Sequence, residues 1–432
     1  MRTAYKCRAY PDPEQTAQLG RTFGCVRLVW NKTLAERHTA YHQRGEKTSY
    51  KQTDAALTAW KRGADLAFLS EVSSVPLQQT LRHQHTAFSH FFAGRAKYPR
   101  FKSRDSKQSA HYTRSAFRMR DGHLTLAKQT APLRLAWSFD DVDLASLNPT
   151  TVIVSREADG RWYATFAVDI DDPAHPPEAA SEVGVDLGVK DFATLSTGEK
   201  IANPRHLERK AKNLARYQRR MARKQRGSAN RRKARAKVAA AHRKVRHARQ
   251  DFLHKTTTRL VREHDVIAIE DLNVRGMTSS ARGTVQVPGR RVRQKAGLNR
   301  AVLDAGLGEF RRQLEYKAAR AGRTVVVVDR WFPSSKTCSE CGYLLATLSL
   351  GTRLWTCPAC RTRHDRDVNA AKNILAAGRV AAREHVPGDA GPPLCDPGEA
   401  RAVGAGAGVS RQGSSLPRSA TKQETGPARV GP

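Results

Sequence analysis

The chain has 432 residues, enough for two or three domains, and 39% of them are hydrophobic, which suffices for folded cores. Its net charge of +36 far exceeds what solubility requires and predicts a polyanionic partner, most simply nucleic acid. No apolar run approaches the roughly 18 residues that span a bilayer, and charges interrupt the first dozen positions, so neither a membrane span nor a signal peptide is expected. A cytoplasmic location follows, in which the seven cysteines are expected to be metal ligands or buried thiols.

The first 178 residues combine strand and helix patterns. Residues 1–10 alternate like a strand, and helical spacing follows from Pro13 and again over 74–92. Strand and turn patterns dominate from 115 to 170, where Asp159-Gly160 is a hairpin signal. These patterns predict a small β-barrel with a helical insert over about 12–95. A proline-containing linker is expected after the last strand of the barrel.

Cations alternate with aromatic residues over 94–104, a pattern that suits phosphate contacts and base stacking. A solvated loop is the alternative. The candidate phosphate contacts in this segment are Lys97, Arg100 and Lys102.

Residues 183–201 predict a strand that contains Asp186, followed by a hairpin at Thr197-Gly198. A carboxylate in such a strand is costly to bury unless it is paired or binds a metal, although an Asp at a strand end can also simply face water.

Residues 205–250 consist largely of Arg, Lys, Ala and Gln, with Glu208 as their only acid. A break at 227–230 predicts two basic helices over about 205–260, which we expect to be antiparallel and to bind a nucleic-acid backbone. Three arginines of this region are candidate contacts: Arg219, Arg220 and Arg223.

Further acids lie in two later stretches whose settings are like that of Asp186. Glu270 ends an apolar strand over 266–270, and Asp365 and Asp367 lie at the start of a predicted helix. A first-strand Asp, a later strand-end Glu and a helix-start Asp form the acid set of an RNase H/RuvC-like nuclease. Such a site holds two divalent ions about 4 Å apart, and its oxygen ligands suit Mg²⁺ or Mn²⁺.

Three elements are predicted between Glu270 and Asp365. Residues 276–297 are expected to form a loop that could cover the site, residues 298–321 one amphipathic helix, and residues 324–329 a strand. Cys338-x2-Cys341 and Cys357-x2-Cys360 have the spacing of a four-thiolate zinc ribbon, whose closed coordination indicates a structural metal. From 379 to 432 the composition predicts a disordered tail.

Four sequence blocks together resemble the TnpB (OrfB-type) family of bacterial insertion sequences, which is related to type V CRISPR nucleases. They are Gly-Val-Asp-Leu-Gly-Val-Lys-Asp, Ile-Glu-Asp-Leu-Asn-Val, Pro-Ser-Ser-Lys-Thr-Cys-Ser-Glu-Cys-Gly and Asp-Arg-Asp-Val-Asn-Ala-Ala-Lys-Asn-Ile. The resemblance covers about residues 1–378.

The resemblance implies an α+β multidomain fold. A β-barrel wedge domain with its helical recognition insert would occupy 1–178, and an RNase H/RuvC-like α/β nuclease domain would occupy 179–378, with a zinc ribbon inserted at 338–360. It also implies an RNA-guided DNA endonuclease that uses a guide RNA from the transposon end, target DNA, Mg²⁺ and a structural Zn²⁺. The implied catalytic acids are Asp186, Glu270 and Asp367, because Asp367 directly precedes the Val-Asn-Ala element, with Asp365 as the alternative third ligand.

Two other functions fit the same residues. A protein-only transposase would join DNA strands with the same acids, and a zinc-ribbon regulator would bind nucleic acid without turnover. The three retained acids argue against the regulator, since binding alone does not need them.

Overall fold

The computed structural model describes residues 2–104, 107–140, 142–170, 179, 181–349 and 351–384, and the structural statements below concern these residues. Their N-terminal half forms a five-stranded antiparallel sheet in the order β2-β6-β7-β1-β5. Its strands are β1 (Arg2–Tyr10), β2 (Gln108–Thr113), β5 (Arg134–Ala136), β6 (Thr151–Arg156) and β7 (Trp162–Asp169).

The expected hairpin at Asp159-Gly160 joins β6 to β7, with Gly160 at a φ of 86°. A second hairpin pairs β3 (Phe117–Arg120) with β4 (His123–Leu126), just after the short 3-10 helix η2 (Arg114–Ala116). Among the described strands, β2 and β5 remain at the two edges of the larger sheet, so closure into a barrel stays a prediction.

Between β1 and β2 the chain forms α1 (Pro13–Arg44), α2 (Tyr50–Arg62), the 3-10 segment η1 (Ala64–Glu71) and α3 (Ser74–Phe92). Helix α1 begins where the Asp12 side chain accepts a hydrogen bond from the Gln15 backbone N–H, and it ends at Gly45, which is left-handed. The helices predicted from Pro13 and over 74–92 are therefore confirmed. No sequence pattern predicted α2.

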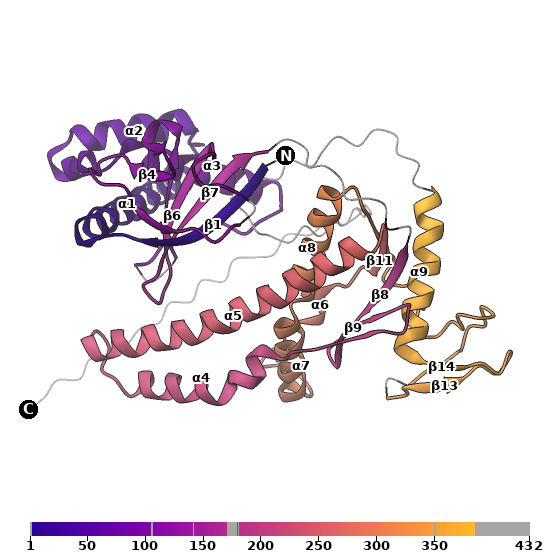
Figure 1. Ribbon diagram of the computed structural model, residues 1–432. Helices are drawn as coiled ribbons and strands as arrows, with labels where there is room; N and C mark the ends of the chain where they lie inside the picture. The colour runs from indigo at the N-terminus through magenta and orange to yellow at the C-terminus, as the bar shows by residue number, and fades with distance from the viewer. Residues whose placement is uncertain are drawn as a thin grey trace, which may run out of the picture. The chain divides into compact units, whose positions relative to one another are not determined.

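The C-terminal half contains a mixed sheet in the order β10-β9-β8-β11-β12, of which β8, β9 and β11 are labelled in Figure 1. The strands are β8 (Glu182–Leu187), β9 (Asp191–Leu195), β10 (Lys200–Ala202), β11 (Val266–Glu270) and β12 (Thr324–Val328). The first three are antiparallel, whereas β11 runs parallel to β8 and β12 runs parallel to β11.

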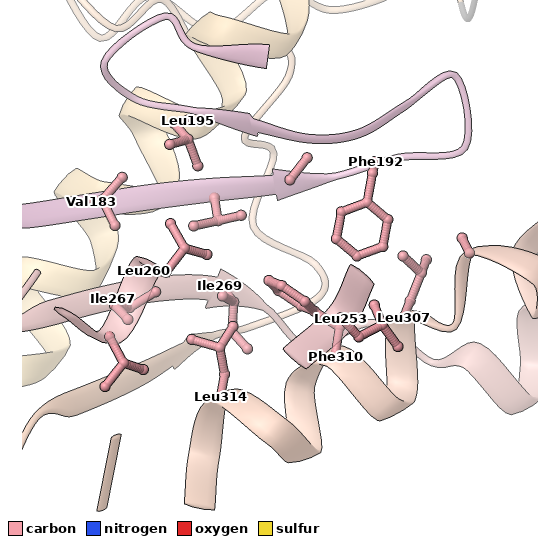
Figure 2. Close-up of a cluster of buried hydrophobic side chains, with 14 of the residues drawn as sticks. Val183, Phe192, Leu195, Leu253, Leu260, Ile267, Ile269, Leu307, Phe310 and Leu314 are labelled. Carbon is pink, nitrogen blue, oxygen red and sulfur yellow. The ribbon is translucent and has the colours of Figure 1, made fainter. Parts of the chain in front are cut away.

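One face of this sheet packs on α5 (Ala229–Glu263), α7 (Val292–Ala305) and α8 (Leu307–Arg320). Figure 2 shows Val183 of β8 and Ile267 and Ile269 of β11 in this core, with Leu260, Phe310 and Leu314 from the helices. Because strand side chains alternate between faces, the residues between these buried ones point to the opposite face.

Helix α9 (Arg366–Glu384) covers that opposite face and contacts β8, β11 and β12. Glycines permit its close approach: a Cβ added to Gly184 would lie 2.0 Å from the Ala371 carbonyl oxygen, and one added to Gly378 would lie 2.6 Å from the Ala268 Cβ. The helix therefore rests almost directly on the backbone of β8 and β11.

The two basic helices are α4 (His206–Ala222) and α5, which pack on one another and run in opposite directions, as predicted (Figure 1). The single helix predicted over 298–321 is wrong. Gly306, at a left-handed φ of 75°, separates α7 from α8, and α7 begins at Val292, inside the segment read as a loop. The last two residues of the short helix α6 (Val274–Met277) also fall within that segment.

Two short strands, β13 (Leu354–Thr356) and β14 (Arg363–Asp365), pair just before α9. The predicted start of the tail at 379 is also wrong, because α9 continues to Glu384. The rest of the predicted tail lies outside the described residues.

Candidate active site and metal centre

The register of the parallel strands brings Asp186 and Glu270 to the same edge of the sheet. Ala268 pairs with Gly184 and Ile269 pairs with Val185, so the next step of the register sets Glu270 beside Asp186. Neighbouring strands lie about 4.8 Å apart, and both side chains alternate onto the face that α9 covers. Two carboxylates, separated by 84 positions in sequence, are thereby neighbours.

Helix α9 brings the third acid to the same place. Ala371 packs against Gly184, and Asp367 lies one turn earlier in the helix, about 6 Å along its axis. Asp186 lies two residues beyond Gly184 on the strand, a rise of about 6.6 Å. Helix α9 runs opposite to β8, because Arg379 late in the helix pairs with Glu182 at the start of the strand, so the matching steps bring Asp367 level with Asp186.

The closeness of the three acids affects the pKa of Asp186. Burial, reinforced by the negative charges of Glu270 and Asp367, raises the pKa of Asp186 from 3.8 to about 7. Arg366 and Arg353 oppose the rise without cancelling it. Three acids with too little positive charge between them are a suitable setting for a cation. Unlike the zinc cluster below, however, these acids are not among the described groups whose ligand atoms lie within 4.8 Å of one another.

Glu270 has a protein partner that the sequence reasoning missed. Its Oε1 accepts a hydrogen bond from the Ser334 hydroxyl at 2.6 Å, and Ser334 is buried. The neighbouring Asp271 is paired with Arg311 and Arg330, which lower the pKa of its carboxyl group. Asp271 is thereby committed to ion pairs, while Glu270 keeps most of its acceptor capacity.

The two acids at the start of α9 have different partners. One Asp365 oxygen accepts the backbone N–H groups of Asp367 and Val368 at 3.0 and 3.2 Å, and the other pairs with Lys200 at 2.7 Å. Asp365 therefore caps the helix, and these bonds hold its pKa below the usual value despite partial burial. Asp367 instead contacts Arg353 at 3.2 Å. This difference favours Asp367 as the third ligand, the choice made from the sequence.

Four cysteine sulfurs form the group whose ligand atoms lie within 4.8 Å of one another: Cys338, Cys341, Cys357 and Cys360. The Cys338–Cys360 and Cys341–Cys357 sulfur separations are 3.6 and 3.7 Å. A tetrahedral zinc with 2.3 Å bonds requires sulfurs about 3.8 Å apart. The cluster fits a structural zinc ion, and His364 Nε2, 3.1 Å from Cys338 Sγ, adds an outer contact.

The candidate nucleic-acid contacts differ in exposure. Lys97 and Arg100 are exposed, as are Arg219, Arg220 and Arg223 around the end of α4. The Lys102 ammonium lies 3.9 Å from the centre of the Trp30 ring, and burial lowers the pKa of Lys102 to about 8. Lys102 is therefore the least available of the six for a phosphate.

No helix among the described residues is long and apolar enough to span a membrane.

Three family profiles match the chain. A profile described as "Probable transposase" matches residues 165–281, a Cas12f1-like TNB domain profile matches 308–374, and a helix-turn-helix profile matches 1–46. In this structure, residues 1–46, which match the helix-turn-helix profile, contain a strand followed by one continuous 32-residue helix.

Two relatives cover most of the chain. A protein of Streptomyces pristinaespiralis named "Putative RNA-guided DNA endonuclease" is 48% identical over 100% of this chain and 98% of its own length. InsQ of Escherichia coli (strain K12), which carries the same description, is 34% identical over 87% of this chain and 92% of its own length.

Among solved structures, the Cas12f1 chain of a complex with single-guide RNA and target DNA shares the fold, with a TM-score of 0.51 and 14% identity. The match covers 87% of this chain and 98% of that one. The two relatives, which match most of the chain, and the matching profiles show that the chain belongs to the TnpB/OrfB family of insertion-sequence proteins.

Proposed function

We propose that this protein is a transposon-encoded, RNA-guided DNA endonuclease. Its catalytic site for phosphodiester hydrolysis would consist of Asp186, Glu270 and Asp367. The observation that carries the proposal is the gathering of these three acids, from two neighbouring strands and one helix, at one edge of a mixed sheet. The names of the two relatives that match most of the chain support cleavage directed by a guide RNA. The transposase profile supports the link to transposition.

The strand order, with three antiparallel strands followed by two parallel ones, supports an RNase H/RuvC-like nuclease domain over 179–378 with the zinc ribbon at 338–360. Residues 1–178 would form the wedge domain with its helical insert at about 12–95. In this proposal the protein acts in the cytoplasm.

The three acids would hold Mg²⁺ or Mn²⁺, which when bound supply positive charge to the attacking and leaving oxygens of the phosphodiester. The chain's own part is to hold these carboxylates on rigid elements. A bound cation would favour the deprotonated form of Asp186, whose pKa the surrounding protein raises. Arg353 and Arg366, whose charges reach Asp186, add positive charge at the edge where a phosphate would enter.

Guide RNA and target DNA are the proposed partners of the basic surface. Helices α4 and α5 present exposed arginines on a segment almost free of acids, an arrangement that neutralises phosphates without reading bases. Arg219, Arg220 and Arg223 are the proposed contacts there, with Lys97 and Arg100 in the N-terminal half. Lys102 is retained as a weaker candidate.

The test is to express the protein with the DNA that flanks its gene and to sequence the RNA that co-purifies. A discrete RNA from the element's end, and Mg²⁺-dependent cleavage that disappears in Asp186→Ala while RNA binding persists, is the expected result. Cleavage without RNA that yields joined strands would favour a protein-only transposase. Salt-labile, heterogeneous RNA without cleavage would favour a binding protein.

A further inference from the structure

Glu270 is the last residue of β11, and its carboxylate has a defined protein partner. The Ser334 hydroxyl donates to Glu270 Oε1 at 2.6 Å, a short charge-assisted hydrogen bond. Ser334 is 4% exposed, so little solvent competes for this contact. The bond occupies one acceptor site of Glu270 and leaves the others available to a cation.

The turn that carries Ser334 is held from inside the protein. The Ser334 N–H donates to the Phe332 carbonyl at 2.8 Å, and the Thr337 N–H donates to the Pro333 carbonyl at 3.1 Å. Two buried asparagines of α9, Asn369 and Asn373, complete the arrangement. Asn373 Nδ2 donates to the carbonyls of Ser334 and Thr337 at 2.8 and 2.6 Å, and Asn369 Nδ2 donates to that of Thr337 at 2.7 Å.

The same helix face connects this turn to the cysteine cluster. Asn369 Oδ1 accepts the backbone N–H of Ser339, the residue after the first cysteine, at 2.9 Å. Asn369 and Asn373 are four positions apart and so lie on one side of α9, whose first turn carries Asp367. One helix thus carries an acid of the candidate site and holds the turn that fixes another.

We infer that Ser334 is a positioning residue, which orients the Glu270 carboxylate for a divalent cation through a turn held by Asn369 and Asn373. The inference rests on the proposed nuclease function, because it presumes that Glu270 binds the cation. It assigns the ribbon's first knuckle a role beyond folding: the knuckle anchors the turn on which the geometry of Glu270 depends.

The test compares Ser334→Ala, Ser334→Thr and Ser335→Ala. The alanine at 334 removes the hydroxyl, and the threonine keeps it. Ser335 is a neighbouring control, because its side chain makes no hydrogen bond within the described part of the chain. Two quantities are measured: Mn²⁺ binding to the protein without nucleic acid, by electron paramagnetic resonance, and the Mg²⁺ concentration that gives half-maximal single-turnover cleavage.

Removing a hydrogen-bond partner of a metal ligand typically weakens metal binding about 10–100-fold. We expect Ser334→Ala to weaken Mn²⁺ binding and raise the required Mg²⁺ by about tenfold or more, with guide RNA binding unchanged. Ser334→Thr should restore most of the loss, and Ser335→Ala should behave as the wild type.

A local unfolding of the turn is distinguished by amide hydrogen exchange. The Thr337 N–H donates to the Pro333 carbonyl and the Ser339 N–H donates to Asn369 Oδ1, so loss of the turn would make both amides exchange faster. Their exchange rates should be the same in Ser334→Ala and wild type, as should the zinc content.

An unchanged Mn²⁺ affinity in Ser334→Ala would overturn the inference while leaving the nuclease proposal intact. So would a loss accompanied by faster amide exchange in the turn or by a lower zinc content, because the effect would then be structural. If the wild type itself neither binds Mn²⁺ nor cleaves with its co-purified RNA, the proposed function fails instead.

Discussion

Gly184 of β8 faces Ala371 of α9 so closely that a side chain would have no room. A Cβ at position 184 would lie 2.0 Å from the Ala371 carbonyl oxygen and 2.8 Å from the Leu375 backbone nitrogen. Both obstructing atoms belong to the backbone, so a rotamer change cannot relieve the clash. This glycine therefore sets the distance between the strand that carries Asp186 and the helix that carries Asp367.

Gly184→Ala should push α9 away from the sheet. Overpacking of this kind costs about 1–3 kcal/mol or more, and we expect a lower melting temperature together with a loss of cleavage larger than the loss of guide RNA binding. Gly20→Ala is the matched control, because, apart from the backbone of α1 itself, no atom lies within 4 Å of its added Cβ. That variant should be about 0.8–1.0 kcal/mol more stable by helix propensity. Equal behaviour of the two variants in thermal melts would contradict the packing argument.

Asp365 and Asp367 should separate stability from activity. Asp365→Ala removes a helix cap and should cost about 1 kcal/mol of stability, measured by urea unfolding, while cleavage persists. Asp365→Asn, which can still cap, should recover most of that loss. Asp367→Asn should abolish cleavage with little change in stability. The opposite pattern would make Asp365 the third ligand.

Asp186 should destabilise the protein when Mg²⁺ is absent. Its pKa of about 7 lies above the unfolded value of 3.8, because burial and the charges of Glu270 and Asp367 outweigh Arg366 and Arg353. The native state then binds the extra proton between these pH values, so this group's contribution to stability falls as pH rises from about 4 to 7 and stays low above.

Asp186→Asn removes that titration. In Mg²⁺-free buffer the variant should melt several degrees above wild type at pH 8, and the difference should vanish below about pH 4. Mg²⁺ should raise the melting temperature of the wild type more than that of the variant. Identical melting curves at pH 8 would show that the three acids do not crowd one another.

The cysteine cluster predicts one tightly bound zinc ion per chain. Cys357→Ser should lower the zinc content measured by atomic absorption and should unfold the ribbon, because the remaining sulfurs cannot complete the tetrahedron. Cys25→Ala, which changes a buried cysteine in the cluster packed around α1 and α3, should retain the zinc. Full zinc occupancy in Cys357→Ser would count against a four-thiolate site.

The sequence patterns located the main strands and several of the helices because each has a local signature. The apolar runs around Asp186 and before Glu270 mark strands, and the cysteine spacing marks the metal site. Hydrophobic periodicity continued across Gly306, so it could not reveal that this glycine ends one helix and starts another. The bond from Ser334 to Glu270 joins positions 64 apart, and only the assembled fold makes it visible.

The central claim is that RNA directs this protein to its cleavage site, and an exchange of the guide tests it most directly. The segment of the co-purified RNA that pairs with DNA is replaced by a new sequence, and cleavage is mapped on DNA that carries both the old and the new target. The proposed function predicts that the cut moves to the new target, requires Mg²⁺ and is absent in Asp186→Ala. Cleavage that stays at the old target, or needs no RNA, would contradict it.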